Sequence, residues 1–206
     1  MVWSICVNRG VARCFFTGLA LRAFAIPADA EEPVVMLEHA NHVGSGLKQE
    51  LVAGITQADF LRPGNRANSV RIVVVTAFNE DNYWLNFNGY SAGKAVYTIP
   101  RGWTVEITFI NPSPSPHSAV VVEREMVKKT QIGPPAFAGA SVPNPVNGIS
   151  TGKAVFSFAA ETAGEYAIAC GVPKHAAGGH WVGFNVSATA KRATLKLGDL
   201  AEREAK

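Results

Sequence analysis

Cysteine is scarce in this sequence, and only Cys170 of the three cysteines lies beyond the first thirty residues. If those thirty residues are removed, the remaining thiol cannot form an internal disulfide. Cys170 is then free, paired with another molecule or bound to a metal. Methionine is equally scarce, because only Met36 and Met126 follow the initial residue.

Other absences narrow the class of function. No apolar run approaches the roughly 20 residues that a membrane-spanning helix needs, and there is no glycine-rich phosphate loop, nucleophilic serine elbow or evident pair of catalytic acids. Of the 19 basic and 16 acidic side chains, three basic and one acidic lie in residues 1–30, so the remainder is almost neutral. We therefore expect no nucleic acid, and specifically no DNA, as a partner.

The first thirty residues have the features of a secretion signal. Arg9 and Arg13 precede the apolar run "CFFTGLALRAFAI", and the small residues "ADA" at 28–30 provide a cleavage site. This predicts a signal peptide over 1–30 and a mature protein in the periplasm or another extracytoplasmic space. Because Arg22 interrupts the run, the alternative is a helix that is buried or rests on a membrane. Without a spanning segment, we expect membrane contact only through a partner.

The pattern of apolar, glycine and polar residues divides the rest of the chain into three parts. Residues 31–69 are predicted to be an N-terminal extension, partly helical and broken by glycines. Residues 70–190 form the main domain, with strand-like runs that begin with "VRIVVVTAF" and "YWLNFNGY". A long ordered loop is expected over 124–150, and 191–206 is predicted to be a polar C-terminal tail with one or two exposed helical turns at most.

Period-two alternation identifies the clearest strand. Trp103, Val105, Ile107 and Phe109 alternate with polar residues in "WTVEITFIN", which is typical of a strand with one buried face. At least seven such runs separated by turn residues predict an all-β fold, an antiparallel β-sandwich or barrel.

Three chemically distinctive residues lie at the ends of strand-like runs. His117 falls in the proline-rich turn "NPSPSPHS", Cys170 ends "EYAIA", and His175 follows in the next turn. Each alone would be an ordinary buried thiol or turn histidine. Together they make the two-histidine, one-cysteine set of a blue-copper electron-transfer site, in which the thiolate donates strongly to copper and imidazole suits both oxidation states.

The motifs that contain these residues also resemble a known family. "FNGYSAGKAVYTIPRGWTVEITFINPSPSPHSAVVV", "NPVNG" and "AGEYAIACGVPKHAAGGHW" occur in the order and wording of sulfocyanins, which are cupredoxins. The resemblance covers roughly residues 70–187. It implies a Greek-key cupredoxin sandwich and one copper ion that cycles between Cu(I) and Cu(II). It also implies an exported protein that transfers single electrons in a respiratory chain. The implied partners are redox proteins such as a cytochrome or a terminal oxidase.

On the matching positions, the resemblance makes His117, Cys170 and His175 the equatorial copper ligands. Ser118 lies where cupredoxins often place a group that hydrogen-bonds to the cysteine loop. The alternation of Asn86, Phe87 and Asn88 makes the two asparagines further candidates for supporting hydrogen bonds.

The chain departs from the family at residue 180, where sulfocyanins carry an axial methionine and this sequence has His180. Two alternatives follow. His180 binds copper as a fourth, harder ligand that favours Cu(II) and lowers the reduction potential. Otherwise it turns aside, helped by the neighbouring glycines or by protonation in an acidic compartment, since the ordinary pKa of histidine is about 6.5.

Two functions from different classes remain open. The first is an electron carrier, which is not an enzyme. The second is a copper enzyme or a binder of nitric oxide, nitrite or peroxide, because a fourth nitrogen ligand is typical of red or green copper sites that can open a coordination position. Copper storage is the weakest reading, because the sequence places no methionine near the thiol.

Overall fold

The structure, a computed structural model, describes residues 46–206. The predicted signal peptide and the first part of the predicted extension lie outside the described residues. The described part contains strands and short 3₁₀ turns, in this order: η1 (Gln49–Leu51), η2 (Gln57–Phe60), β1 (Arg62–Pro63), β2 (Ser69–Val75), η3 (Asp81–Trp84), β3 (Ala95–Pro100), β4 (Thr104–Asn111), β5 (Val120–Glu123), η4 (Arg124–Lys128), β6 (Gly152–Ala159), β7 (Gly164–Ala169), β8 (Trp181–Ser187), β9 (Thr194–Leu197) and β10 (Arg203–Glu204).

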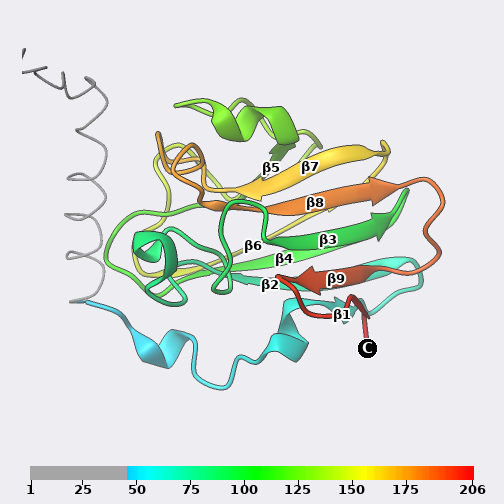
Figure 1. Cartoon of the computed structure of the whole chain (residues 1–206), viewed down its shortest axis with the longest axis horizontal. Helices are drawn as coiled ribbons and strands as arrows, with labels where there is room; N and C mark the ends of the chain where they lie inside the picture. Colours follow the sequence, from blue (N-terminus) through cyan, green and yellow to red (C-terminus); the bar gives the residue numbers. More distant parts are fainter. Residues whose placement is uncertain (1–45) are drawn as a thin grey trace, which may run out of the picture.

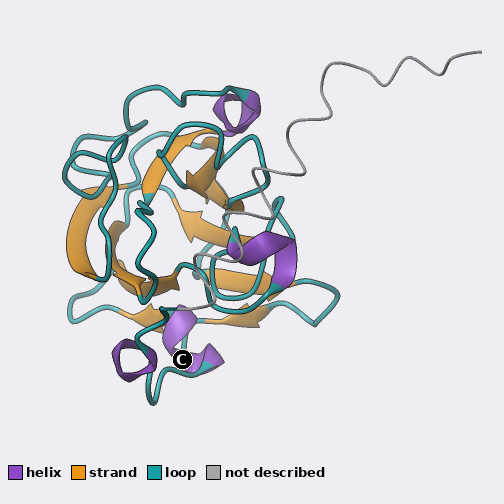
Figure 2. Cartoon of the chain, turned by 90° about the vertical axis from the view of Figure 1, so that its left-hand side faces the viewer, coloured by secondary structure: helices purple, strands orange, loops and turns teal. Residues whose placement is uncertain are grey.

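The strands form two sheets (Figures 1 and 2), with a large hydrophobic cluster that includes side chains of both sheets and a smaller second cluster around β5 and β7. One sheet has the order β1-β2-β4-β6, and the other has the order β10-β9-β3-β8-β7-β5. The predicted all-β sandwich is therefore confirmed. Its long loop over 124–150 is also present, with η4 as the regular element at its start.

The alternation in β4 has the predicted result. Val105, Ile107 and Phe109 are fully buried, whereas Thr104 and Glu106 on the opposite face are exposed. Burial of each such apolar side chain contributes about 1.5–3 kcal/mol. Period-two patterning thus determines which face of this sheet meets the core.

Strand direction differs from the expectation of a purely antiparallel sandwich. β2 runs parallel to β4, and β3 runs parallel to β8. The chain passes from β2 to β3 in the other sheet before it returns to β4, so the two strands of this parallel pair are not consecutive in sequence. Side-chain alternation reports burial but not direction, which is why the sequence could not reveal these parallel pairs.

The C-terminal segment is not the exposed polar tail that the sequence predicted. β9 pairs with β3, and β10 pairs with β9. Ala193, Leu195 and Leu197 enter the core, while Thr194 between them is half-buried and Lys196 is exposed. At the other end, β1 and the start of β2 precede residue 70, and the described part of the extension forms η1 and η2 rather than longer helices. The sandwich therefore exceeds the predicted 70–190 boundaries at both ends.

The run 83–90, "YWLNFNGY", is also not a strand. Asn82, Tyr83 and Trp84 have positive φ angles of 53°, 54° and 66°, so the backbone makes a left-handed turn that a strand cannot accommodate. Phe87 retains only isolated bridges to Thr76 and Tyr90.

The topology gathers several chain turns at one end of the sandwich, on the left in Figure 1 and facing the viewer in Figure 2. The end of β2, the turn after β4, the end of β7 and the start of β8 all lie there. Among residues 46–206, no helix has the length and apolar character needed to cross a membrane.

Candidate metal centre

Four side chains from two separate loops converge at this end. His117 lies in the turn between β4 and β5, Cys170 directly follows β7, and His175 and His180 belong to the loop before β8. One ligand atom from each residue lies within 4.8 Å of those of the other three. His117, Cys170 and His180 are fully buried, and His175 is partly exposed. The structure therefore brings together all four residues that the sequence predicted as metal ligands.

Backbone hydrogen bonds close the loop that carries three of these residues. The N–H of Cys170 donates to the carbonyl of His180 at 3.0 Å, and this bond continues the β7–β8 ladder by one step. The N–H of His180 donates in turn to the carbonyl of His175 at 3.0 Å. The loop is thus tied at its base and across its middle, which fixes the spacing of its side chains.

His117 is held by a different segment. Its N–H donates to the carbonyl of Ile149 at 3.2 Å, and its carbonyl accepts from the N–H of Ile149 at 2.7 Å. Gly148 allows this close approach, because a Cβ there would lie 2.8 Å from the carbonyl oxygen of His117. The "NPVNG" motif therefore supports the first histidine.

Cys170 has polar neighbours from Ser118. The backbone N–H of Ser118 donates to the Cys170 Sγ at 3.4 Å. The Ser118 hydroxyl lies 3.8 Å from the same sulfur, donates to the carbonyl of Pro145 at 2.7 Å and accepts from the N–H of Gly171 at 2.7 Å. Ser118 thus joins three loops at the sulfur, as predicted for a residue that supports the cysteine.

Burial raises the pKa of the Cys170 thiol to about 11, although the hydrogen bond from the Ser118 backbone acts in the opposite direction. In the metal-free protein the group is therefore a neutral thiol at ordinary pH. A thiolate at this buried position needs a compensating positive charge close by. A metal ion that replaces the proton would supply that charge.

The imidazoles crowd around the sulfur. Nδ1 of His175 lies 3.4 Å from Cys170 Sγ. The ring centroid of His117 is 5.1 Å from that of His175 and 5.0 Å from that of His180. A set of one thiol and three imidazoles, with no carboxylate among them, has the donor chemistry of a copper or zinc site rather than of a calcium or magnesium site.

His180 points into the cluster and does not turn aside. Its Nε2 lies 2.9 Å from the Thr76 Oγ1, and the Phe87 ring packs against it with centroids 4.3 Å apart. Sequence reasoning missed Thr76 and Phe87 as neighbours of the site. The position of Thr76, directly after the buried strand β2, was the one available signal.

Asn86 and Asn88 have a less direct role than the sequence predicted. The Asn86 side chain accepts from the N–H groups of Phe78 and Gly89 and donates to two carbonyls, so its hydrogen-bonding capacity is used within its own loop. Asn88 bonds to the backbone of β2 and to the Tyr97 hydroxyl. Both asparagines hold the segment that presents Phe87 to His180.

Asn82 links the left-handed turn to the metal loop. Its side-chain amide donates to the carbonyl of Leu85 at 2.8 Å and to the carbonyl of Gly178 at 2.9 Å. Three successive non-glycine residues with positive φ store strain of roughly 1–2 kcal/mol each. The two hydrogen bonds help to hold this turn against the loop between His175 and His180.

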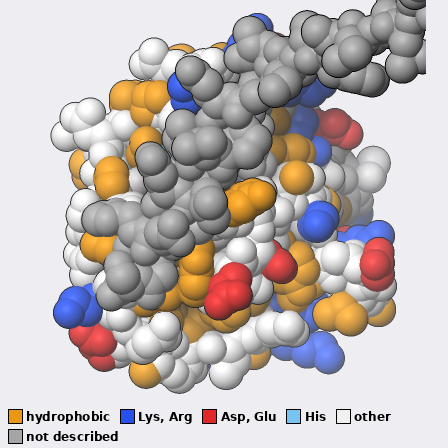
Figure 3. All heavy atoms as spheres, turned by 60° about the vertical axis from the view of Figure 1, so that its left-hand side comes forward, with side chains coloured by type: hydrophobic (Ala, Val, Ile, Leu, Met, Phe, Trp, Pro, Cys, Tyr) orange, Lys and Arg blue, Asp and Glu red, His pale blue; other side chains and the backbone are white. Residues whose placement is uncertain are grey.

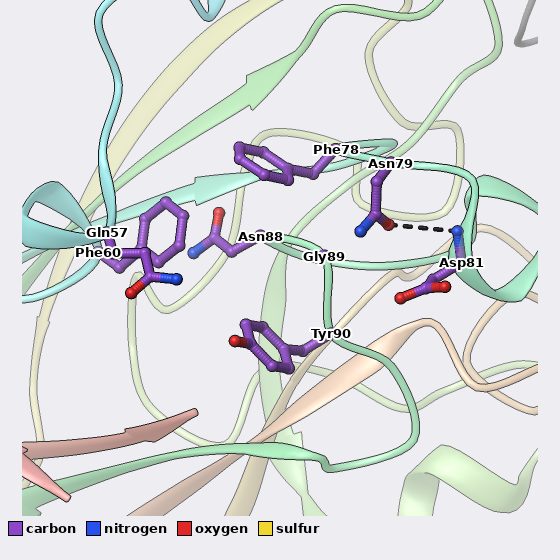
Figure 4. Close-up of a pocket in the computed structure, with 8 residues that line it drawn as sticks. All are labelled: Gln57, Phe60, Phe78, Asn79, Asp81, Asn88, Gly89 and Tyr90. Carbon is purple, nitrogen blue, oxygen red and sulfur yellow. Dashed lines mark hydrogen bonds between the residues drawn. The ribbon is translucent and has the colours of Figure 1, made fainter. Parts of the chain in front are cut away.

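A pocket of about 370 Å³ lies beside this region (Figure 4). Its lining includes Phe60, Phe78 and Tyr90, with Gln57, Asp81 and Asn88 among its polar side chains. The N–H of Asp81 donates to the Asn79 side chain at its rim. None of the four clustered residues lines this pocket, so it is separate from the candidate metal centre.

Comparison with solved structures finds similar proteins at low identity. The chain is similar to reduced auracyanin from Roseiflexus castenholzii, with 23% identity over 57% of this chain and 96% of that chain and a TM-score of 0.41. It is similar to reduced rusticyanin with 22% identity over 68% of this chain and 97% of that chain, at a TM-score of 0.37.

Comparison of sequences is more informative. A curated sulfocyanin from Sulfolobus acidocaldarius is 34% identical over 125 residues, which cover 57% of this chain and 62% of the relative, so the chain matches less than two thirds of that protein. The sulfocyanin (SoxE) domain profile matches residues 59–193, well over half of the chain. This protein therefore belongs to the sulfocyanin family.

Proposed function

We propose that this chain is an exported carrier of single electrons in a respiratory chain, with copper held by His117, Cys170, His175 and His180. The observation that carries the proposal is the convergence of one thiol and three imidazoles within 4.8 Å at one end of the sandwich. Family membership and this donor set together confirm the expectation of one copper ion as the cofactor.

Bound copper supplies a one-electron couple between Cu(I) and Cu(II). The contribution of the protein is a closed set of donors whose backbone is fixed in advance. His117 is paired with Ile149, and the Cys170–His180 backbone bond closes the base of the loop. Because these bonds do not depend on oxidation state, the donors have little need to move when an electron arrives or leaves, which favours rapid transfer.

Electrons would enter and leave the site through His175. It is partly exposed, whereas the other three side chains are fully buried. Hydrophobic side chains, together with uncharged side chains and backbone, make up most of the described surface visible in Figure 3, with charged groups scattered among them. A redox partner such as a cytochrome or a terminal oxidase would exchange electrons here through a small, transient contact.

Export is supported by the sequence of residues 1–30. The basic start, apolar run and small-residue cleavage site have the order of a secretion signal. We therefore place the mature protein in the periplasm or another extracytoplasmic space.

The alternative function, a copper enzyme or a binder of nitric oxide, nitrite or peroxide, is favoured by one observation. His180 adds a third imidazole at the position where the family carries a thioether. The burial of His180 and its packing against Phe87 argue against it, because an exchangeable position needs space for the incoming ligand. The carrier function is therefore the better supported of the two.

The test is to load the full-length chain with Cu(II) and to record absorption and electron paramagnetic resonance spectra. A carrier is expected to show a thiolate-to-copper absorption band that disappears on one-electron reduction and returns on oxidation. Cys170→Ser is the matched control and should lose this band. The reduced protein should also be oxidised by host membranes in a reaction that cyanide blocks.

Two results would contradict the carrier function. One is a spectrum that changes on addition of nitrite, nitric oxide or peroxide at constant oxidation state, which would favour the ligand-binding alternative. The other is a copper-loaded protein that host membranes neither reduce nor oxidise.

A further inference from the structure

The contact between Thr76 and His180 sets the chemistry of the fourth donor. Both residues are fully buried, and Thr76 Oγ1 lies 2.9 Å from His180 Nε2. Thr76 is fixed in turn, because its backbone N–H donates to the carbonyl of Ile110 at 3.0 Å at the end of the β2–β4 pair. The hydroxyl is therefore held at a fixed place beside the ring.

A neutral imidazole carries one proton on one of its two ring nitrogens, and the nitrogen without the proton is the one that can bind a metal. Thr76 is not one of the four clustered residues, and its hydroxyl is hydrogen-bonded to Nε2 of His180. The nitrogen that His180 can offer to a shared metal is consequently Nδ1. For Nδ1 to have its lone pair available, the proton must be on Nε2, and the threonine oxygen must accept it.

The ring has little freedom to exchange its two nitrogens. Phe87 packs against one side at 4.3 Å, and the His117 ring meets it nearly edge-on at 74° and 5.0 Å. The His180 main chain is held by the carbonyl of His175 and by the N–H of Cys170. A ring flip would give up the Thr76 contact inside a fully buried site.

We propose that Thr76 is a positioning residue for the fourth donor. Its hydroxyl accepts a hydrogen bond from Nε2–H of His180, and this fixes the tautomer that presents Nδ1 to the metal. The proposal rests on the proposed function, in which the four clustered residues hold copper. It goes further by stating which nitrogen His180 offers and which residue selects it.

The opposite arrangement has an opposite consequence. If the threonine hydroxyl donates to Nε2, the proton is on Nδ1, and His180 lies beside the site without binding. The site would then have three donors, and its spectrum would not respond to residue 180. The direction of a single hydrogen bond therefore separates a four-donor site from a three-donor site.

The first experiment needs neither copper nor a variant. Long-range ¹H–¹⁵N correlation spectra of the full-length metal-free protein report the tautomer of each histidine, with His180→Met identifying the signals of residue 180. We expect the Nε2–H tautomer for His180. The Nδ1–H tautomer in the metal-free protein, retained by residue 180 when the diamagnetic ion Cu(I) is bound, would overturn the proposal.

The second experiment compares Thr76→Val, Thr76→Ser and His180→Ala, each loaded with Cu(II). Valine matches the shape of threonine but cannot accept a hydrogen bond, whereas serine can. Loss of a residue that orients a metal ligand typically costs about 10–100-fold in metal affinity. We expect a loss in that range for Thr76→Val in competition with a chelator, with its copper spectrum and reduction potential shifted toward those of His180→Ala. Thr76→Ser should restore the wild-type spectrum.

The outcomes separate the two proposals. A wild-type protein that binds no copper, or lacks the thiolate-to-copper band, would refute the proposed function. A wild-type protein with that band, and with the same spectrum and potential in Thr76→Val and His180→Ala, would leave the carrier intact and overturn the role of Thr76. A purely structural role for Thr76 would change stability in Thr76→Val and leave the copper spectrum of the folded variant unchanged.

Discussion

The backbone N–H of Ser118 points at the sulfur of Cys170 across 3.4 Å, and the hydroxyl of the same serine receives the N–H of the next residue, Gly171. One residue thus supports the cysteine through its main chain and the cysteine loop through its side chain. These two contributions can be separated by mutation.

Ser118→Ala should destabilise the protein and leave the thiolate-to-copper band largely unchanged. The substitution leaves the carbonyl of Pro145 and the N–H of Gly171 without the buried hydroxyl, and each unsatisfied buried group costs about 1–3 kcal/mol. The main-chain bond to the sulfur stays. Denaturant unfolding of the metal-free protein measures the first effect, and absorption of the copper form measures the second. An unchanged free energy of unfolding would show that water replaces the hydroxyl at no cost.

The Cys170 thiol should make the stability of the metal-free protein depend on alkaline pH. Burial raises its pKa from 9.0 to about 11. The folded state therefore retains a proton that the unfolded state loses, so this contribution is complete below pH 9 and is lost as the pH rises to about 11. Because a shift of one pKa unit corresponds to 1.36 kcal/mol, the free energy of unfolding should fall by about 2–3 kcal/mol.

The measurement is the free energy of unfolding from pH 7 to 11, with Cys170→Ala as the control for other groups that titrate. The difference between the two proteins should shrink or reverse in the alkaline range. Iodoacetamide should also modify Cys170 more slowly in the folded metal-free protein than in the unfolded chain. Parallel pH profiles for the two proteins would contradict this account.

The sequence was sufficient for the sandwich and for the four converging residues. The alternation of apolar and polar residues over 103–109 predicts which face of a strand is buried. The apolar residues Val105, Ile107 and Phe109 are the buried ones in β4. Cys170 and His175 are close in sequence and lie at a strand end, so their proximity needed no knowledge of strand direction. His117 could be assigned to the same site because its turn also follows a strand-like run.

What the sequence could not reveal depends on pairing between distant segments. Thr76 is 104 residues from His180, and its position at the end of a buried strand does not by itself show that it contacts that histidine. The parallel β2–β4 pair that carries Thr76 to this end arises from a crossover between sheets. Leu195 and Leu197 were hidden among charged residues, and their burial depends on pairing with β3. The left-handed turn at Asn82 is fixed by a contact with Gly178, which lies 96 residues away.

Asn82→Ala should loosen the metal loop. The substitution removes two hydrogen bonds, one of them to the carbonyl of Gly178, and keeps a residue with a Cβ at a φ of 53°. A loss of about 1–3 kcal/mol is expected from the bonds. Copper transfer to a chelator should become faster, because the loop that carries His175 and His180 loses an anchor.

Asn82→Gly separates strain from hydrogen bonding. It removes the same two bonds but tolerates a positive φ without steric cost, so it should be less destabilising than Asn82→Ala by about 0.4–1 kcal/mol. Unfolding curves of the two variants measure this difference, and copper release should be similarly fast in both. Slow, wild-type release from either variant would mean that Asn82 does not anchor the loop.

Leu195→Ala should lower the free energy of unfolding as much as a mutation of a leucine in the middle of the sandwich, although Leu195 lies in the segment predicted to be a tail. Leu195 is fully buried, whereas Leu200, only five positions later, is 55% exposed. Removal of a buried leucine side chain costs about 2–5 kcal/mol, because the transfer free energy is lost and a cavity remains, whereas Leu200→Ala should change the free energy of unfolding by less than about 0.5 kcal/mol. Denaturant unfolding of the two variants beside wild type is the measurement. Equal, small effects would mean that β9 is dispensable for the core, and in that case a chain ending at residue 190 should fold and bind copper as the full chain does.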